Sequence, residues 1–545
     1  MKRVIGYCVK QFRSAVIRSG QVLKKSSQKE SLCIILILLG SFFLRSHIIH
    51  LPGPNPDELL YVFQAERLLM GDQLWCPSIT IGNISLPVGL DGYQGAFPIY
   101  IHWMLSKLTN YPYRFRIINI FYAIGMMIFV YYFVLSYFGK RPAIFALLFL
   151  STMPSILFFC RIGEIAIFLR VILASALLYF FHKWWVKKPS WSSFYVGCAV
   201  LGLGMSTRLE IMWYLPAVVA YLILLNRTLM IEVLSYIWSN KGKMLIGIMW
   251  FLMGGSLYIL YNVVTGGGII HQIAENLFVT YGGHSNLDVF NNLIERVKQL
   301  MILFNGSDIW GMNEVYKNTL FSFVFGIAFV SLFFVAIAKR FRKKADRKIE
   351  FLLFMLVCLL LESTFSVSGI NIMHILIIIP IPILIMAKFL DLIPFRYLST
   401  LIVTILLIGN LWVDAKYYHS LSRNGGKGIF SPRACSFVKE IERRKILKVD
   451  ACDWGLARLV YYFSNGNIKV KEIFGYSQGI PPSFYDNLKI DSGDPNNCFL
   501  FYAFPYETFK RRETFLDYLR NQGLQYDEEV FSDKYGPLYV LYKKK

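Results

Sequence analysis

Charged residues are scarce in this chain of 545 residues. Asp, Glu, Lys and Arg together make up 17% of the sequence, whereas 55% of the residues are hydrophobic. This balance excludes an ordinary soluble domain, and the long apolar runs predict a polytopic membrane protein. The net charge of +23 indicates orientation in a membrane rather than nucleic-acid binding, because the Lys and Arg residues cluster between apolar segments.

Three short motifs are also missing. The nine cysteines include no C-x-x-C pair, so their spacing indicates neither a zinc site nor a disulfide framework. Cys452 and Cys498 could pair in an exported domain, but free buried thiols are the favoured interpretation. Neither D-x-D nor GxxxxGK[ST] occurs, which argues against metal-assisted use of a nucleotide sugar and against ATP-driven transport.

Hydropathy divides the chain into three parts. Residues 1–30 form a basic amphipathic lead-in, and residues 414–545 alternate helix-like and strand-like patterns that predict a small α/β domain. Between them, residues 31–413 contain about eleven apolar segments that suit membrane spans. The predicted spans are 31–51, 115–137, 142–159, 163–181, 194–206, 209–225, 244–264, 320–338, 349–367, 372–389 and 397–413.

The basic clusters between the spans predict an orientation. With a cytosolic N-terminus, the clusters at 140–141, 183–188, 227–243 and 339–348 all fall in the cytosol. The same threading exports residues 45–114, residues 265–317 and the C-terminal domain. We therefore expect an integral protein of a bacterial inner membrane, with the N-terminus cytosolic and the C-terminal domain exported.

The stretch PNPDELLYVFQAERLLMGDQLW follows the first span and carries two adjacent carboxylates, Asp57 and Glu58. Pro56 favours the turn into a helix, and acids in a first turn complement the helix dipole. The periodicity predicts an amphipathic helix on the membrane surface, acids facing water, that ends at Gly71. Helix capping alone would explain the acids, but a carboxylate fixed at this boundary also suits a general base.

The order of residues around this pair resembles a known family. Arg45, the Asp57-Glu58 pair, Tyr61, Ala65, Leu68, Leu69 and Gly71 look like the R…DE…Y…A…LL.G signature of membrane glycosyltransferases with the GT-C fold. The protein O-mannosyltransferase and lipid A aminoarabinose transferase branch is the most similar.

Later segments resemble the same branch. They are GAFPIYIHWML from Gly95, Arg116 at the start of a span, GLGMSTR from Gly202 and HILIIIPIPILIMA from His374. The resemblance covers residues 45–387. Arg208 stands where the family has Lys, and Glu164 stands where Asp is common.

The resemblance implies a GT-C architecture, with interfacial helices in the first exported loop. It also implies transfer of a sugar from a polyprenyl-phosphate donor to a lipid, glycan or protein acceptor on the exported face. An attacking hydroxyl must lose a proton, and the leaving phosphate gains from fixed positive charge. We assign the base to Asp57 and the phosphate contact first to Arg208.

Further candidates complete the predicted site. Glu58 and Glu164 are additional catalytic candidates, Arg116, Arg161 and His374 are additional phosphate ligands, and Tyr61 and His284 are substrate contacts. The sequence assigns no cofactor with certainty, and a divalent cation is a candidate whose ligands the sequence does not name.

Structural interpretations stand beside these roles. Arg161 and Glu164 have the spacing of a helix-surface ion pair, and Arg45 and Arg116 have the position of membrane anchors. His374 suits a packing role, and the segment around His284 suits a plain flexible loop.

Two other functions were weighed. A transporter or flippase of a lipid-linked saccharide would place charges near mid-membrane and show repeated halves, and neither feature is visible. A receptor or scaffold would leave the acidic pair unexplained.

Overall fold

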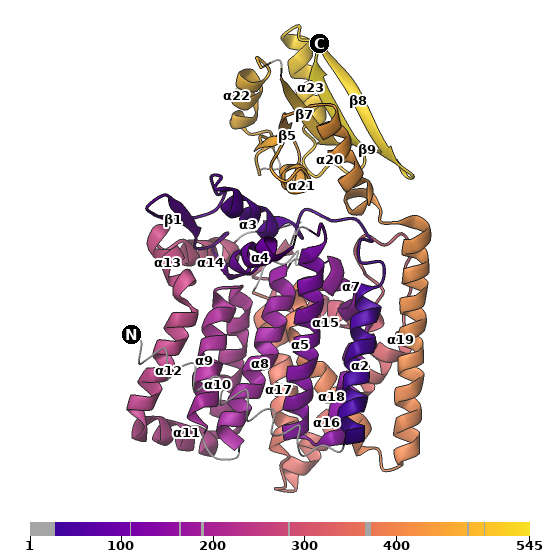
Figure 1. The fold of residues 1–545 in the computed structure, drawn as a ribbon. Coiled ribbons are helices and arrows are strands. Elements are labelled where there is room, and N and C mark those ends of the chain that lie inside the picture. Colours follow the sequence, from indigo (N-terminus) through magenta and orange to yellow (C-terminus); the bar gives the residue numbers. More distant parts are fainter. Residues whose placement is uncertain are drawn as a thin grey trace.

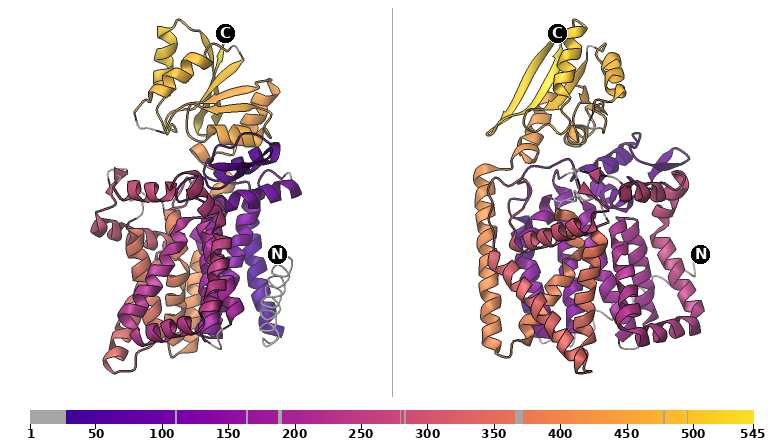
Figure 2. Two further views of the ribbon diagram at one scale, coloured as in Figure 1. Left: turned by 90° about the vertical axis from the view of Figure 1, so that its left-hand side faces the viewer. Right: turned by 180° about the vertical axis from the view of Figure 1, so that it is seen from behind.

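The protein is a helical bundle with an α/β domain at one end (Figure 1). The computed structural model describes residues 28–109, 111–162, 165–186, 190–278, 280–281, 284–365, 372–476, 479–494 and 496–545. Two further views place the same domain at the same end of the bundle (Figure 2).

Each of the predicted spans coincides with a helix or with a bent pair of helices. They are α2 Gln28–Ser46, α5 Arg114–Tyr137, α6 Lys140–Thr152 with α7 Pro154–Ile162, α8 Ile165–Val186, α9 Trp191–Met205, η1 Leu209–Trp213 with α10 Tyr214–Leu225, α12 Lys241–Gly254 with α13 Ser256–Val264, α16 Thr319–Phe341, α17 Arg347–Ser363, η2 Ile372–Ile378 with α18 Pro380–Leu392, and α19 Arg396–Asn424. Two of the breaks, at Pro154 and Pro380, fall where proline removes a helix hydrogen bond.

Within the described residues, four helices are long and apolar enough to cross a membrane alone, namely α5, most of α8, α16 and α19. The number rises to eight if each bent pair is one span. The other three predicted spans coincide with α2, α9 and α17. The last two are only 15 and 17 residues long, and α2 carries charged residues at both ends.

Contacts between helix ends gather the basic residues at one end of the bundle. Lys140 Nζ lies 2.7 Å from Glu30 Oε2, and Arg347 Nη1 donates to Asn226 Oδ1 (2.6 Å). Helix α11 (Arg227–Ser239) runs across this end, bent by 119° from the η1–α10 pair (Figure 1). The α/β domain lies at the opposite end, which is the alternation that the threading predicts.

Two loop regions connect spans at the end of the bundle nearest the domain (Figure 1). The first contains α3 Leu60–Met70, the hairpin of β1 Ser78–Ile81 and β2 Ile84–Pro87, and α4 Phe97–Leu108. The second contains α14 Gly268–Phe278, the pair of β3 Thr280–Tyr281 and β4 His284–Ser285, and α15 Val289–Asn305. The predicted interfacial helices in the first loop are therefore α3 and α4.

The C-terminal domain has a five-stranded sheet in the order β6-β5-β7-β9-β8, parallel across β6, β5 and β7 and antiparallel across β7, β9 and β8. Its elements are η3 Gly428–Phe430, α20 Arg433–Arg443, β5 Lys448–Ala451, α21 Leu456–Phe463, β6 Lys469–Glu472, α22 Pro482–Asp491, β7 Asn497–Tyr502, α23 Arg512–Asn521, β8 Tyr526–Asp533 and β9 Gly536–Lys544. The predicted boundary at 413/414 falls inside α19.

Side chains alternate across β7 and give the sheet two apolar faces. Phe499 and Phe501 pack with residues of α22 and α23. Leu500 and Tyr502 point to the other face, whose core is continuous with that of the bundle. Cys452 and Cys498 are free buried thiols.

Candidate active site

Helix α3 begins at Leu60, after the acidic pair, and ends at Gly71, which adopts a left-handed φ of 75°. The predicted end is confirmed, but the prediction of a surface helix with both acids facing water is wrong, because the pair precedes the helix and Glu58 is buried. Residues 61–67 are all buried, because α4 packs on α3 from within the first loop and α21 packs on it from the C-terminal domain. The sequence pattern cannot reveal a cover that comes from so far along the chain.

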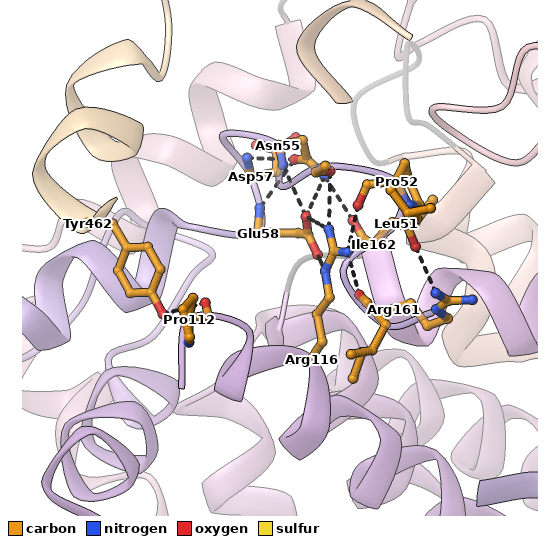
Figure 3. A network of polar contacts seen from close by, with 12 residues as sticks. Leu51, Pro52, Asn55, Asp57, Glu58, Pro112, Arg116, Arg161, Ile162 and Tyr462 are labelled. Atoms are coloured by element: carbon orange, nitrogen blue, oxygen red, sulfur yellow. Dashed lines mark hydrogen bonds and ion pairs between the residues drawn. The ribbon is translucent and has the colours of Figure 1, made fainter. Parts of the chain in front are cut away.

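Glu58 faces the protein interior. It is fully buried, and Arg116 donates from Nε to Oε1 (2.8 Å) and from Nη2 to Oε2 (2.7 Å). The backbone N–H of Asn55 adds a third hydrogen bond at 3.0 Å (Figure 3). Burial raises the pKa of the Glu58 carboxyl, and the Arg116 charge opposes that shift.

Arg116 uses all five of its N–H groups within the protein. Besides Glu58, its Nη1 donates to the carbonyls of Ile49 (2.8 Å) and Pro52 (2.7 Å), and its Nη2 donates to Gly53 (3.2 Å). The guanidinium is fully buried. Arg116 therefore has no N–H group left for a donor phosphate, and it is not a membrane anchor reaching to water.

Arg161 holds the same segment from the end of α7. Its Nη2 donates to the carbonyls of Ile48 (2.6 Å) and Leu51 (2.8 Å) (Figure 3), and its guanidinium lies 5.2 Å from the Tyr418 ring centre. Arg116 and Arg161 thus bind alternating carbonyls of the loop that leads to Asp57. Glu164, the predicted partner of Arg161, lies outside the described residues.

Arg45 is also buried rather than exposed as an anchor. Its guanidinium donates to the carbonyls of Leu150 (2.8 Å) and Ser151 (3.1 Å) and so ties α2 to the end of α6.

Asp57 sits on a turn held by Asn55. The Asn55 side-chain oxygen accepts from the backbone N–H groups of Asp57 (2.8 Å) and Glu58 (3.2 Å), and its amide donates to the carbonyl of Ile162 (2.9 Å). Asn55 therefore stabilises the turn before α3, whereas the N-cap residue of the helix, Leu59, has no side-chain cap. Unlike Glu58, Asp57 is only half-buried, so it is the carboxylate of the pair that a substrate can reach.

A second charged cluster joins four residues from three spans. Glu210 lies 2.7 Å from Arg170 Nη1 and 3.2 Å from Arg208 Nε. Arg208 Nη2 is 3.3 Å from His374 Nδ1, and Arg170 Nη2 donates to the carbonyl of His374 (2.6 Å). Both guanidiniums are buried.

Arg208 and His374 were predicted for this site, whereas Arg170 and Glu210 were not. The signal that could have found them is a charged residue inside an apolar span, which is costly unless it has a functional or structural partner.

The two charged regions are connected through the first loop. Tyr61 is fully buried and donates its hydroxyl to Gln94 Oε1 (3.2 Å). Gln94 forms an antiparallel backbone bridge with Arg208, and the Arg208 guanidinium lies 5.2 Å from the Tyr93 ring centre. The segment after α3 therefore pairs directly with the segment that carries Arg208.

The remaining predicted residues lie elsewhere. His284 is in β4, which pairs with β3, and Asp288 caps α15 by accepting from Asn291 N (3.3 Å). Across the described ranges, no group of three or more His, Cys, Asp or Glu side chains is placed to hold a metal ion.

Comparisons with known proteins agree with this architecture. The family model described as dolichyl-phosphate-mannose-protein mannosyltransferase matches residues 96–250. The crystal structure of ArnT from Cupriavidus metallidurans bound to undecaprenyl phosphate is similar over 95% of this chain and 98% of that chain, with a TM-score of 0.64. The chain has the GT-C fold. The resemblance to the protein mannosyltransferase and aminoarabinose transferase branch is thereby confirmed.

More distant GT-C proteins share the arrangement. The archaeal oligosaccharyltransferase AglB from Archaeoglobus fulgidus, in complex with an inhibitory peptide and a dolichol-phosphate, is similar over 95% of this chain and 74% of that chain, with a TM-score of 0.50. Sequence identity is 11% for both ArnT and AglB, so the likeness is one of fold. A search of curated protein sequences finds no significant match.

Proposed function

We propose that this GT-C protein is a glycosyltransferase that moves a sugar from a polyprenyl-phosphate donor to an acceptor on the exported face of a bacterial inner membrane. The observation that carries the proposal is that an accessible carboxylate and a separate arginine cluster lie at the same end of the bundle. A half-buried carboxylate, Asp57, is fixed on a turn. A separate arginine cluster around Arg208 lies under the loop that follows.

Each part has a defined chemical task. The acceptor hydroxyl attacks the anomeric carbon, its proton passes to Asp57, and the bond from that carbon to the phosphate oxygen breaks. The bonding electrons leave with the polyprenyl phosphate, whose negative charge the Arg208 and Arg170 guanidiniums stabilise. Glu210 holds both guanidiniums, and His374 contacts Arg208.

Glu58 takes a positioning role in this scheme. Its oxygens are engaged by Arg116 and Asn55, so it fixes the turn that presents Asp57 instead of reacting itself.

Apolar side chains are exposed on the helix that follows the arginine cluster. Helix α10 follows Arg208 in the chain through η1, and its Leu215, Val219 and Leu224 side chains are exposed. A prenyl chain would cover these side chains while its phosphate reaches the guanidiniums.

Replacing Asp57 by Asn tests the base. We expect cells that express Asp57→Asn to retain the lipid-linked donor and lose the glycosylated product, because an amide cannot accept the acceptor's proton. The measurement is mass spectrometry of extracted lipid-linked sugars and surface glycans, compared with cells that lack the gene.

The matched control is Asp486→Asn, the same change at an exposed position of α22, which should leave the product at the wild-type level. Product formation by Asp57→Asn at the wild-type level would contradict the assignment of the base.

A further inference from the structure

Helix α21 of the C-terminal domain packs on α3. The Tyr461 ring lies 5.2 Å from the Phe63 ring, and the Arg67 guanidinium lies 5.2 Å above Tyr461. The Tyr461 hydroxyl donates to Asp72 Oδ2 (2.6 Å), just beyond the end of α3. Burial raises the pKa of Tyr461, so the hydroxyl keeps its proton and remains a donor at neutral pH.

The same domain touches the turn that carries Asp57. Gly455, directly before α21, has a left-handed φ of 76°, and a Cβ at this position would overlap the Pro56 ring. Pro56 is the residue immediately before Asp57. A second contact lies on the other side of the turn, where Gly53 N donates to the carbonyl of Phe430 (2.6 Å).

Another side of α3 contacts the bundle. Glu66 pairs with Arg114 at the start of α5, and Ser106 of α4 donates to the same carboxylate (2.6 Å). The Tyr462 hydroxyl reaches past α3 and donates to the carbonyl of Pro112 (2.9 Å) (Figure 3). Helix α3 and the turn before it are therefore held between the bundle and the C-terminal domain.

The packing makes the two parts one body at this point. A single apolar core contains Leu59 and Phe115 from the bundle side together with Val460 and Tyr462 from α21. The Phe115 and Tyr462 ring centres lie 5.8 Å apart. A displacement of α21 must therefore move side chains that also contact the residues flanking the acidic pair.

We propose that Gly455 and Tyr461 are positioning residues for sugar transfer, and that the C-terminal domain sets the position of Asp57 through them. This inference rests on the proposed function of Asp57. A base displaced by about 1 Å loses on the order of 100-fold in rate. The domain thus acts on the chemical step and not on donor binding, because the Arg208 cluster is held by other spans.

Two glycine substitutions separate positioning from stability. Gly455 and Gly523 both have left-handed backbones in the C-terminal domain, but only a Cβ at Gly455 meets Pro56, while one at Gly523 meets open space. Gly455→Ala and Gly523→Ala therefore carry a similar backbone cost. We expect Gly455→Ala to lower kcat per folded molecule about 10- to 100-fold with the KM for donor unchanged, and Gly523→Ala to leave both constants at wild-type values.

Hydrogen exchange provides a readout that does not need activity. In Gly455→Ala, amides of residues 53–70 should exchange faster than in the wild type, whereas Gly523→Ala should leave them protected. Tyr461→Phe removes only the hydrogen bond to Asp72 and should give a smaller change of the same kind. Its kcat should fall without a change in the KM for donor.

The outcomes distinguish the two proposals. A wild-type protein that transfers no sugar defeats the proposed function, and the positioning role with it. If the wild type is active, two results would overturn the positioning role alone. The first is a wild-type kcat per folded molecule for Gly455→Ala, and the second is a loss of kcat no larger than that of Gly523→Ala.

Discussion

Two buried charge networks stand at the same end of the bundle and differ in how their arginines are used. At Glu58, one guanidinium serves one carboxylate and three backbone carbonyls, and every N–H group of Arg116 has a protein partner. At Glu210, two guanidiniums, from Arg170 and Arg208, share one carboxylate. The first network has one guanidinium for one carboxylate, whereas the second places two guanidiniums on Glu210, and the phosphate site that we propose rests on this second arrangement.

Buried arginines that fix the backbone can be distinguished from buried arginines that could bind an anion by the partners of their N–H groups. A guanidinium that donates to several backbone carbonyls fixes the backbone, as Arg116 and Arg161 do for the loop before Asp57. A guanidinium that shares its counter-ion suits an anion that comes and goes. Substitutions in the two networks should therefore fail in different ways.

The largest effect is expected for Arg116→Ala. The change leaves Glu58 buried without its main partner, which costs about 3–5 kcal/mol, and it frees three carbonyls of the loop. The folded fraction after detergent extraction, measured by size-exclusion chromatography, should fall sharply. Glu30→Gln is the control, because its partner Lys140 is largely exposed and such a pair contributes less than about 1 kcal/mol. Equal folded fractions for the two variants would contradict the structural role of Arg116.

Arg208→Gln should give the opposite pattern. Glu210 keeps Arg170 as a partner at 2.7 Å, so the folded fraction should stay close to that of the wild type. The rate of transfer should fall about 100-fold, since one stabilising contact to the leaving phosphate is removed. Turnover and folded fraction measured on the same preparation test this. A variant that unfolds but retains its specific activity would place Arg208 with Arg116.

Asp450 is another buried carboxylate, and unlike Glu58 it has an incomplete set of hydrogen-bond partners. Asn497 Nδ2 donates to its Oδ2 (2.6 Å), while Oδ1 lacks a partner within the described part of the chain. Burial and the neighbouring Asp491 charge raise the pKa of Asp450 to about 7, against the opposing effect of the Asn497 hydrogen bond and of Lys471 and Lys448. The folded domain therefore binds this proton more tightly than the unfolded chain does.

The smallest effect follows from that titration and is confined to the C-terminal domain. Because the folded pKa lies above the ordinary value of 3.8, stability falls as pH rises from about 4 to about 7 and changes little above that range. Asp450→Asn should raise the Tm of the domain at pH 8 and leave it nearly unchanged at pH 4. Thermal unfolding of the full-length protein at both pH values measures this. A larger gain in Tm from Asp450→Asn at pH 4 than at pH 8 would contradict the sign of this pH dependence.

Much of the fold follows from local sequence signals. Each predicted span coincides with a helix or bent pair, because hydropathy is a property of consecutive residues. The α/β class of the C-terminal domain was expected for the same reason, although β6 gives no such signal. The sequence of β6 is KVKE, a short polar strand that shows no apolar alternation.

The candidate site was less accessible, since its contacts join distant segments. Glu58 and Arg116 are 58 positions apart, so the sequence assigned a phosphate to a guanidinium that the fold gives to a carboxylate. Arg170 and Glu210 were overlooked for the same reason. Asn55 was not predicted to form the turn, although Asn commonly does so, because capping was assigned to the adjacent acids.

The packing of α21 on α3 also has a consequence for the order of synthesis. Asp72 and Tyr461 are separated by 389 positions, so α3 leaves the ribosome long before the helix that covers it. Until α21 folds, Phe63 and Arg67 lack the Tyr461 ring, although Trp75 of the same loop can already pack on both. The chain can thus insert its first spans well before the Asp57 turn is complete, and the sugar transfer that we propose would begin only once the C-terminal domain has packed on α3.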